Sequence, residues 1–278
     1  MKIEDMRQHF LARAPWVAPQ RTIDQIRLGE GDREVHTVGT GWCACAANLH
    51  AAAADGCDLF ISHEAPFACD AGADGGRDTP WGRRRAQICT EAGMALMNLH
   101  DTWDHWPTYG VRDSWSAFLE LGKPVRILDY VHPGQAVATH GRASLALHEV
   151  PATTAEAFAR HVARRVREIG RENVTLLGQP DARVHTVATG VGCHIPSFEA
   201  REAGADLVVV VYDRALQTTV RLPLEEVGAA VVTVEHGTAE MPAMRNLARY
   251  ITETFGDLEA TFYAREPVSR LIRPTAGG

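Results

Sequence analysis

Two short segments of the chain carry an imidazole and a carboxylate at the same spacing. His100 precedes Asp104 by four residues, and His236 precedes Glu240 by four residues. Each histidine closely follows a short apolar run, where a buried strand would end. Imidazole and carboxylate side chains together suit zinc, iron, manganese or cobalt. The spacing therefore predicts metal ligands at the carboxyl ends of two corresponding strands, where open α/β sheets bind ligands.

A third polar cluster, His63 and Glu64, follows the apolar run 59–61, and Pro66 ends that strand. The corresponding segment of the second half, Val211–Asp213, has no histidine. The alternative to a metal site is a polar cleft without metal, and we favour the metal site. His36 and His185 have no neighbouring carboxylate in the sequence, so we expect them to be structural.

The chain contains an internal repeat. Val35–Gly41 recurs 149 residues later as Val184–Gly190, with six of seven residues identical. Residues 56–61 recur 148 residues later as 204–209. A twofold self-similarity at about half the chain length indicates a duplication rather than a solenoid. The Gly39-Thr40-Gly41 segment is too short for a phosphate-binding fingerprint, so we expect a tight turn from strand to helix.

Each copy predicts strands that alternate with helices, and therefore an α/β fold. The helices are expected at 44–54 and 197–203, and the later strands at 59–61, 95–99, 207–211 and 230–234. A helix at 114–121 precedes a link at 122–124. A strand at 143–150 then leads into a helix that Thr153 or Thr154 caps and Gly170 ends. The prediction is two similar three-layer α/β lobes, residues 1–124 and 125–278.

Composition narrows the function. The 278 residues include 28 Lys and Arg and 35 Asp and Glu, a net charge of −7. We expect no nucleic-acid partner, because such binding usually needs a basic surface. No apolar run is long enough to span a membrane, and an acidic pair stands where a signal peptide would be apolar. We therefore expect a cytoplasmic protein with reduced cysteines, in which Cys43 and Cys45 pack at a helix start.

Three segments carry a resemblance to a known family. Gly56–Pro66, His100–Asp104 and Glu235–Glu240 are similar, in this order, to the metal motifs of the Nif-three-like dinuclear metal-centre family, also known as GTP cyclohydrolase type 2-like. The resemblance extends from about residue 23 to about residue 255. It implies two similar α/β lobes, a two-metal site in the cleft between them, and a ring-shaped homohexamer. The chain resembles a short form from a divergent branch.

The resemblance also implies a ligand set for two divalent ions of iron, manganese or zinc. The implied ligands are His63, Glu64, Asp104, His236 and Glu240. His100 stands where a nearby histidine occurs in the family. Glu64 replaces the family's second histidine. As a ligand, Glu64 would favour manganese or iron. If Glu64 is instead the general base, one of the two metal ions is lost.

These expectations predict a metal-dependent hydrolase that acts on a small polar or heterocyclic, nucleotide-like substrate. Glu64 and His100 are the predicted catalytic residues. Arg84 and Arg85 are predicted to bind a phosphate or carboxylate group of the substrate. The alternative is that they lie on a solvated helix face. Trp103 is predicted to stack on the substrate, and the alternative is that it packs in the core. Two other functions stay open: a metal-binding adaptor without turnover, and an iron-dependent oxidative enzyme that uses His63, His236 and Glu240.

Overall fold

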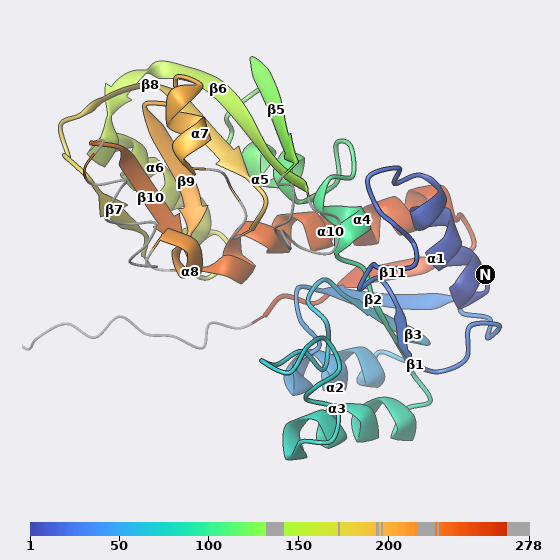
Figure 1. The fold of residues 1–278 in the computed structure, drawn as a ribbon. Helices are drawn as coiled ribbons and strands as arrows, with labels where there is room; N and C mark the ends of the chain where they lie inside the picture. The colour runs from blue at the N-terminus through green and yellow to red at the C-terminus, as the bar shows by residue number, and fades with distance from the viewer. Residues whose placement is uncertain are drawn as a thin grey trace, which may run out of the picture. The chain divides into compact units, whose positions relative to one another are not determined.

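Figure 1 shows the computed structural model, which divides into two compact α/β units. The structure describes residues 1–131, 142–171, 173–192, 195, 197–215, 226 and 228–265. The first unit holds the described residues of Met1–Trp115, Leu128–Ser144 and Glu240–Arg265, and the second holds those of Ser116–Ile127 and Leu145–Ala239. Mixed α/β architecture in two units agrees with the predicted fold class. The boundary predicted at residue 124 stays a prediction.

The first unit contains most of the predicted site residues. Its elements in chain order are α1 (Ile3–Ala12), β1 (Ile26–Leu28), β2 (Thr37–Gly41), α2 (Ala46–Ala54), β3 (Leu59–Ser62), α3 (Pro80–Glu91), β4 (Ala95–Asn98), α4 (Asp101–Asp104), α5 (Val111–Phe118), α10 (His236–Thr254) and β11 (Glu259–Phe262). Helices α5 and α10 contribute residues to both units.

The sheet of the first unit brings three strand ends to one edge. Its order is β1-β4-β3-β2-β11, with β2, β3, β4 and β11 parallel and β1 antiparallel to β4. Gly41 pairs with Ser62, and Ser62 pairs with Asn98. Residues that follow these three positions therefore lie at the same carboxyl edge of the sheet, as expected for parallel strands.

Helices cover both faces of this sheet. Helices α2 and α3 lie side by side on one face (Figure 1). There Leu49 and Ile88 join Phe60 and Leu96 of the sheet in a buried apolar cluster. Part of α10 crosses the other face, where the Thr40 hydroxyl donates to the Met244 carbonyl at 2.9 Å. This unit therefore has the three layers that the sequence predicts.

The glycines of the Gly39-Thr40-Gly41 segment lie inside β2 rather than in the predicted tight turn. A Cβ atom on Gly39 would stand 2.8 Å from the Phe60 ring, and one on Gly41 would stand 2.9 Å from it. Such distances are shorter than van der Waals contact permits. The spaced glycines therefore make room for a neighbouring aromatic ring, which corrects the prediction of a turn.

The second unit repeats this plan. Its elements are β5 (Arg126–Val131), β6 (Arg142–Thr154), α6 (Ala155–Arg167), β7 (Thr175–Leu177), β8 (Arg183–Gly190), α7 (Ser197–Glu202), β9 (Leu207–Val211), α8 (Tyr212–Ala215) and β10 (Ala230–Val234). The sheet order is β5-β6-β8-β9-β10-β7. Strands β8, β9 and β10 are parallel, and β7 is antiparallel to β10 as β1 is to β4.

One hydrogen-bond pattern explains why the repeated sequence blocks match. The Asp58 carboxylate accepts the backbone N–H groups of His36 and Thr37 at 2.8 and 3.1 Å. In the second unit, Asp206 accepts those of His185 and Thr186 at 2.9 and 2.8 Å. In each unit, the aspartate of the later repeated segment thus anchors the strand formed by the earlier repeated segment. Both repeated histidines contribute backbone groups here, which agrees with a structural role.

The remaining elements differ from prediction mainly at their ends. The helix expected at 114–121 is α5, which begins three residues earlier. The strand expected at 143–150 continues to Thr154 in β6. The Thr154 hydroxyl then accepts the Ala157 N–H at 3.2 Å and caps α6, which selects between the two predicted caps. None of the helices formed by the described residues is long and apolar enough to cross a membrane.

A buried aspartate holds the turn that follows β4. The Asp24 carboxylate accepts three successive backbone N–H groups, from His100 at 2.6 Å, Asp101 at 3.0 Å and Thr102 at 2.8 Å. These groups open the one-turn helix α4, which has no partner for them within itself. Asp24 therefore acts as a distant N-cap and fixes the start of the segment that carries His100 and Asp104.

This capping role predicts the effect of removing the carboxylate. Replacing Asp24 by Ala leaves three donors without their acceptor, two of them buried, and each buried donor costs about 1–3 kcal/mol. We expect Asp24→Ala to lower the free energy of unfolding by about 3 kcal/mol or more, measured by urea denaturation. The matched control, Asp257→Ala on the surface, should stay within about 0.5 kcal/mol of the unaltered protein. Equal stability of the two variants would contradict the capping role.

Candidate metal centre

The carboxyl edge of the first sheet gathers the predicted ligands of that unit. His63 and Glu64 directly follow β3, and His100 follows β4 after one residue. Asp104 is the last residue of α4, and Glu240 lies in the first half of α10. All five belong to the first unit. The parallel register of β3 and β4 explains why residues 37 positions apart, His63 and His100, meet at one place.

His63 lies at the centre of this cluster. Its Nδ1 atom is 3.2 Å from the Leu99 carbonyl oxygen, which can only accept, so Nδ1 carries a proton. Its Nε2 atom stands 3.4 Å from Asp104 Oδ1 and 3.5 Å from Glu240 Oε2. All three side chains are buried. A histidine held by a backbone carbonyl through one nitrogen, with the other facing carboxylates, is the usual arrangement of a metal ligand.

The donor set fits a divalent metal ion. The buried Nε2 atom of His63 makes no hydrogen bond within the described part of the chain. His63, His100 and Asp104 each offer a ligand atom, and these atoms lie within 4.8 Å of one another. Buried carboxylates are costly unless they are paired or bind a cation. The cluster therefore has both the ligand types and the excess of negative charge that zinc, iron or manganese requires.

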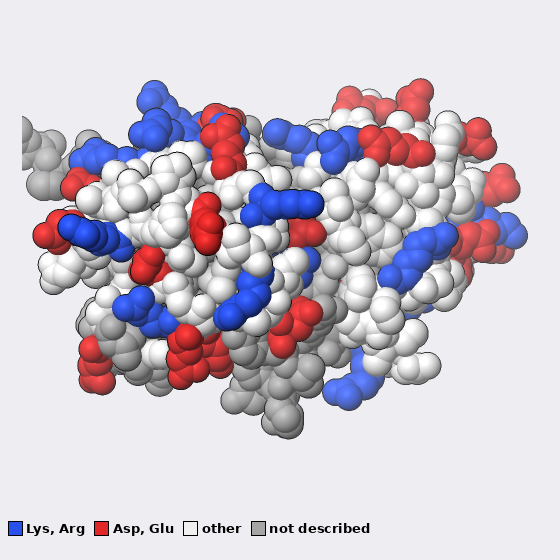
Figure 2. Space-filling model, turned by 90° about the horizontal axis from the view of Figure 1, so that it is seen from above, with Lys and Arg blue, Asp and Glu red and all other residues white. Residues whose placement is uncertain are grey.

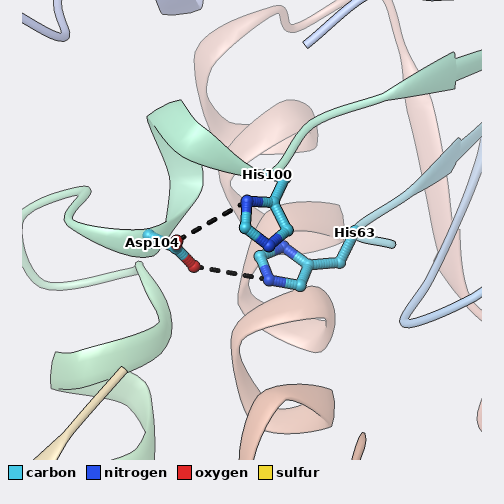
Figure 3. Close-up of side chains that lie close together, drawn as sticks. All are labelled: His63, His100 and Asp104. Carbon is cyan, nitrogen blue, oxygen red and sulfur yellow. Dashed lines mark ion pairs between the residues drawn. The ribbon is translucent and has the colours of Figure 1, made fainter. Parts of the chain in front are cut away.

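His100 stacks on His63, with ring centroids 4.5 Å apart and an angle of 20° between the rings (Figure 3). Its Nδ1 atom lies 3.0 Å from Asp101 Oδ1 and 3.6 Å from Asp104 Oδ2. Asp101 is itself held, because its Oδ2 atom accepts the Thr22 hydroxyl at 2.7 Å. Asp101 thus helps to orient the His100 ring through its Nδ1 atom.

The pKa directions follow from this crowding of carboxylates. Burial alone lowers the pKa of His63, but the charges of Glu240 and Asp104 outweigh it and raise the pKa. Burial likewise opposes the shift at His100, where Asp104 and Asp101 raise the pKa well above its usual value. Both imidazoles therefore favour a positive charge at this place, which a metal cation would also supply.

Glu240 and Glu64 form a second pair of candidate ligands, with ligand atoms within 4.8 Å of each other. The Trp42 indole N–H donates to Glu240 Oε2 at 2.7 Å and so holds the buried carboxylate in place. The Glu64 backbone N–H donates to the Trp42 carbonyl at 2.9 Å. Trp42 therefore positions both glutamates, one through its side chain and one through its backbone.

His236 is the first residue of α10, one helical turn before Glu240. Residues four apart on a helix share a face, so the two side chains project from the same side of α10. The His236 Nδ1 atom lies 2.8 Å from Asp213 Oδ2, within the second unit. A carboxylate at Nδ1 is a usual support of a metal-binding imidazole, because it fixes the orientation of the ring. The separation of four residues between His236 and Glu240, noted in the sequence, is thus one turn of helix.

The predicted substrate residues have different surroundings. Arg84 is exposed on α3, as a solvated helix face would be. Arg85 is half-buried, and its guanidinium donates to the Pro66 carbonyl at 2.5 Å. Trp103 is fully buried, and its indole N–H donates to the Ala243 carbonyl at 3.0 Å. The contacts of Trp103 are those expected of a core residue. The substrate-binding roles of Arg84, Arg85 and Trp103 stay predictions.

Sequence reasoning missed the residues that support the ligands. Asp24 and Trp42 have no motif of their own, and Trp42 is 198 residues from the carboxylate it holds. Asp101 was visible as part of the His100–Asp104 segment, but nothing in the spacing distinguishes its role from that of Asp104. The fold shows that Asp101 Oδ1 lies 3.0 Å from His100 Nδ1, a contact that the spacing does not reveal.

Comparison with solved structures shows a shared fold. Protein ybgI, described as of unknown function, is 19% identical in sequence and has a TM-score of 0.74. The match covers 97% of this chain and 100% of the ybgI chain. A Bacillus cereus protein related to NIF3 is 14% identical, with 99% of both chains covered and a TM-score of 0.72. Reduced HcgD from Methanocaldococcus jannaschii is 17% identical, with 94% and 97% covered and a TM-score of 0.66.

No curated protein matches the sequence of this chain. The family model Duf34/NIF3 (NGG1p interacting factor 3), however, matches residues 1–267. This match covers all three segments on which the resemblance to the Nif-three-like family depends, and it confirms that resemblance. The chain belongs to the Duf34/NIF3 family.

Proposed function

We propose that the chain is a metal-dependent hydrolase with two divalent metal ions. The observation that carries this proposal is the buried His63 imidazole, whose Nε2 atom faces the carboxylates of Asp104 and Glu240 at 3.4 and 3.5 Å. Such a set of buried ligands is costly to maintain unless a cation binds there. Family membership and the candidate ligand groups support metal binding, and hydrolysis is the further step of the proposal.

The proposed ligands are those expected from the sequence: His63, Glu64, Asp104, His236 and Glu240. With three carboxylates and two imidazoles, this set suits iron or manganese, because oxygen ligands favour harder metals. Asp213 supports His236 in this assignment, and Trp42 supports Glu240. Divalent metals in a paired site polarise the substrate and make water a nucleophile near neutral pH.

His100 and Asp101 are the proposed proton-handling pair. The Asp101 carboxylate holds His100 Nδ1 at 3.0 Å, so the ring presents Nε2 in a fixed orientation. His100 is also the one imidazole of the buried cluster that is partly exposed. It can therefore exchange a proton with a substrate while Asp101 stabilises the charged ring. Glu64, which is half-buried, is the alternative general base.

The proposed substrate is a small polar or heterocyclic molecule, and an anionic group on it would bind Arg84 or Arg85. Basic and acidic side chains are interspersed on the face shown in Figure 2. The proposal includes no nucleic-acid partner, as expected from the net charge of −7. A homohexamer and a cytoplasmic location complete the proposal, and the resemblance to the family motivates the hexamer.

Metal content tests the ligand assignment. We expect two equivalents of iron, manganese or zinc per chain in the protein purified without added metal, measured by plasma mass spectrometry. Glu240→Ala should lose one equivalent or more, together with any hydrolytic activity, because its carboxylate faces both ligand groups. The control is Glu253→Ala, an exposed carboxylate on the same helix. Full metal content in Glu240→Ala would rule out the assignment.

The role of Glu64 is tested by Glu64→His, which restores the residue type that the family has there. If Glu64 is a ligand, the variant should keep two equivalents and shift its preference toward zinc. A rise from one equivalent to two would instead identify Glu64 as the general base of a one-metal site. No metal in either protein after reconstitution would contradict the proposal.

Trp42→Phe tests the support of Glu240. The variant keeps an aromatic ring but removes the N–H that lies 2.7 Å from Glu240 Oε2. Loss of such a supporting hydrogen bond typically lowers metal affinity about 10- to 100-fold. We expect that loss in competition titrations with a chelator, and no change in Trp81→Phe, where the exposed ring lies on α3. Equal affinities in the two variants would contradict the role of Trp42.

A further inference from the structure

Arg27 lies in the middle of β1 and is buried, with 7% of its side chain exposed. Its guanidinium donates to three acceptors from separate segments of the first unit. These are the Ile23 carbonyl at 2.5 Å, the Asn98 side-chain oxygen at 3.2 Å and the Asp74 carboxylate at 2.6 Å. A guanidinium can make several such contacts at once, because its N–H groups diverge in a planar fork. Arg27 therefore connects three segments of this unit.

Asn98 extends the connection to the candidate metal ligands. It is the last residue of β4, and its side-chain nitrogen donates to the His63 carbonyl at 2.5 Å and to the Ser62 carbonyl at 3.3 Å. The His63 carbonyl belongs to the peptide group that joins His63 to Glu64, the two expected ligands after β3. The Asn98 amide thus accepts from Arg27 through its oxygen and donates to the ligand segment through its nitrogen. Only one side chain separates Arg27 from that peptide group.

The Ile23 contact reaches a second part of the site. Ile23 directly precedes Asp24, whose carboxylate caps α4 through three backbone N–H groups. The Ile23 backbone N–H itself donates to Asp101 Oδ2 at 3.2 Å. Arg27 therefore holds the backbone beside the residue that fixes the start of α4.

The segment that follows the ligands, residues 67–79, contacts Arg27 on both its side chain and its backbone. Asp74 accepts from the Arg27 guanidinium, and the Arg77 guanidinium donates to the Arg27 carbonyl at 2.6 Å. About half of the Asp74 side chain is exposed, so water weakens this ion pair. The contacts that Arg27 makes with its two uncharged acceptors are therefore expected to matter more for positioning.

Stability alone does not explain a buried arginine with these partners. Removing a charge from water is costly, and a buried ion pair is by itself weak evidence for stability. The Arg27 Nε–H group makes no hydrogen bond within the described part of the chain, which adds to that cost. What the arginine does provide is a defined geometry, because its rigid fork sets the positions of several acceptors relative to one another.

We propose that Arg27 is a positioning residue of the candidate metal centre, which acts through Asn98 on the peptide group between His63 and Glu64. The inference rests on the proposed function, because it takes these two residues as metal ligands. Arg27→Lys keeps the positive charge but removes the fork, since an ammonium group is a point charge. The Asn98 side chain then loses the donor that orients it, and the His63 carbonyl is held less firmly.

The first measurement is hydrogen exchange of the full-length protein, read by mass spectrometry as purified and after chelation of metal. In Arg27→Lys, residues 61–66 should exchange about fivefold faster or more, the factor that one hydrogen bond typically contributes. Helix α2 of the same unit should be unchanged, which distinguishes local opening from a global loss of stability. Arg33→Lys is the matched control, because 36% of its side chain is exposed and it lies 4.0 Å from Asp58.

The second measurement is metal affinity, from competition titrations with a chelator. Arg27→Lys should lose about tenfold or more, as is typical when a residue that supports a ligand is changed. Asn98→Leu should lose a similar factor, and the double variant should lose no more than the larger single loss, because both changes break the same connection. Asp74→Ala, which removes only the half-exposed ion pair, should change the affinity by less than about twofold. If Asn98→Leu does not fold, Asn98→Ser removes the same amide.

Three results would overturn the proposal. The first is unchanged exchange of residues 61–66 in Arg27→Lys. The second is equal metal affinity in Arg27→Lys and Arg33→Lys. The third is a double variant whose loss of affinity is the product of the two single losses. Faster exchange of residues 61–66 in a protein that binds no metal would instead contradict the proposed function, while confirming that Arg27 positions the His63 peptide group.

Discussion

The burial of two carboxylates beside one imidazole is the constraint on which the rest of the site depends. Asp104 and Glu240 are both buried, and both face the Nε2 atom of His63. Removing such charges from water costs several kcal/mol per ion unless an opposite charge compensates. The fold therefore has to hold the carboxylates of α4 and α10 against their mutual repulsion, beside the segment that follows β3. A divalent cation at their centre is the simplest source of the missing charge.

The surrounding structure supplies the forces that hold these segments. The parallel sheet aligns the ends of β3 and β4, and the His63 and His100 rings stack there. Asp24 fixes α4 through three backbone N–H groups. Trp42 fixes Glu240 from the end of β2. Both of these supporting residues lie just outside the strands, Asp24 before β1 and Trp42 after β2.

Much of this fold could be predicted from sequence because the signals are local or repeated. The apolar runs locate β3, β9 and β10 to within one residue. The duplicated blocks are similar because Asp58 and Asp206 make the same pair of backbone hydrogen bonds in the two units. His63 and Glu64 could be proposed as ligands because they directly follow an apolar run, which the structure shows as β3. The family match over residues 1–267 agrees with the motifs read from those positions.

What could not be predicted depends on contacts between distant segments. Asp24 lies 76 residues before the His100 amide that it accepts, and neither residue has a pattern that indicates the other. The two glycines Gly39 and Gly41 were expected in a turn. The sequence does not show that the Phe60 ring lies against β2 and requires glycine there.

Anomalous diffraction from crystals of the protein as purified tests the central claim most directly. Data collected at the absorption edges of iron, manganese and zinc locate each metal and identify it. The account predicts an anomalous peak about 2.0–2.2 Å from His63 Nε2 and within coordination distance of Asp104 and Glu240. The absence of any anomalous peak there would contradict the account, if His63 Nε2 makes direct hydrogen bonds to both carboxylates in the same crystals.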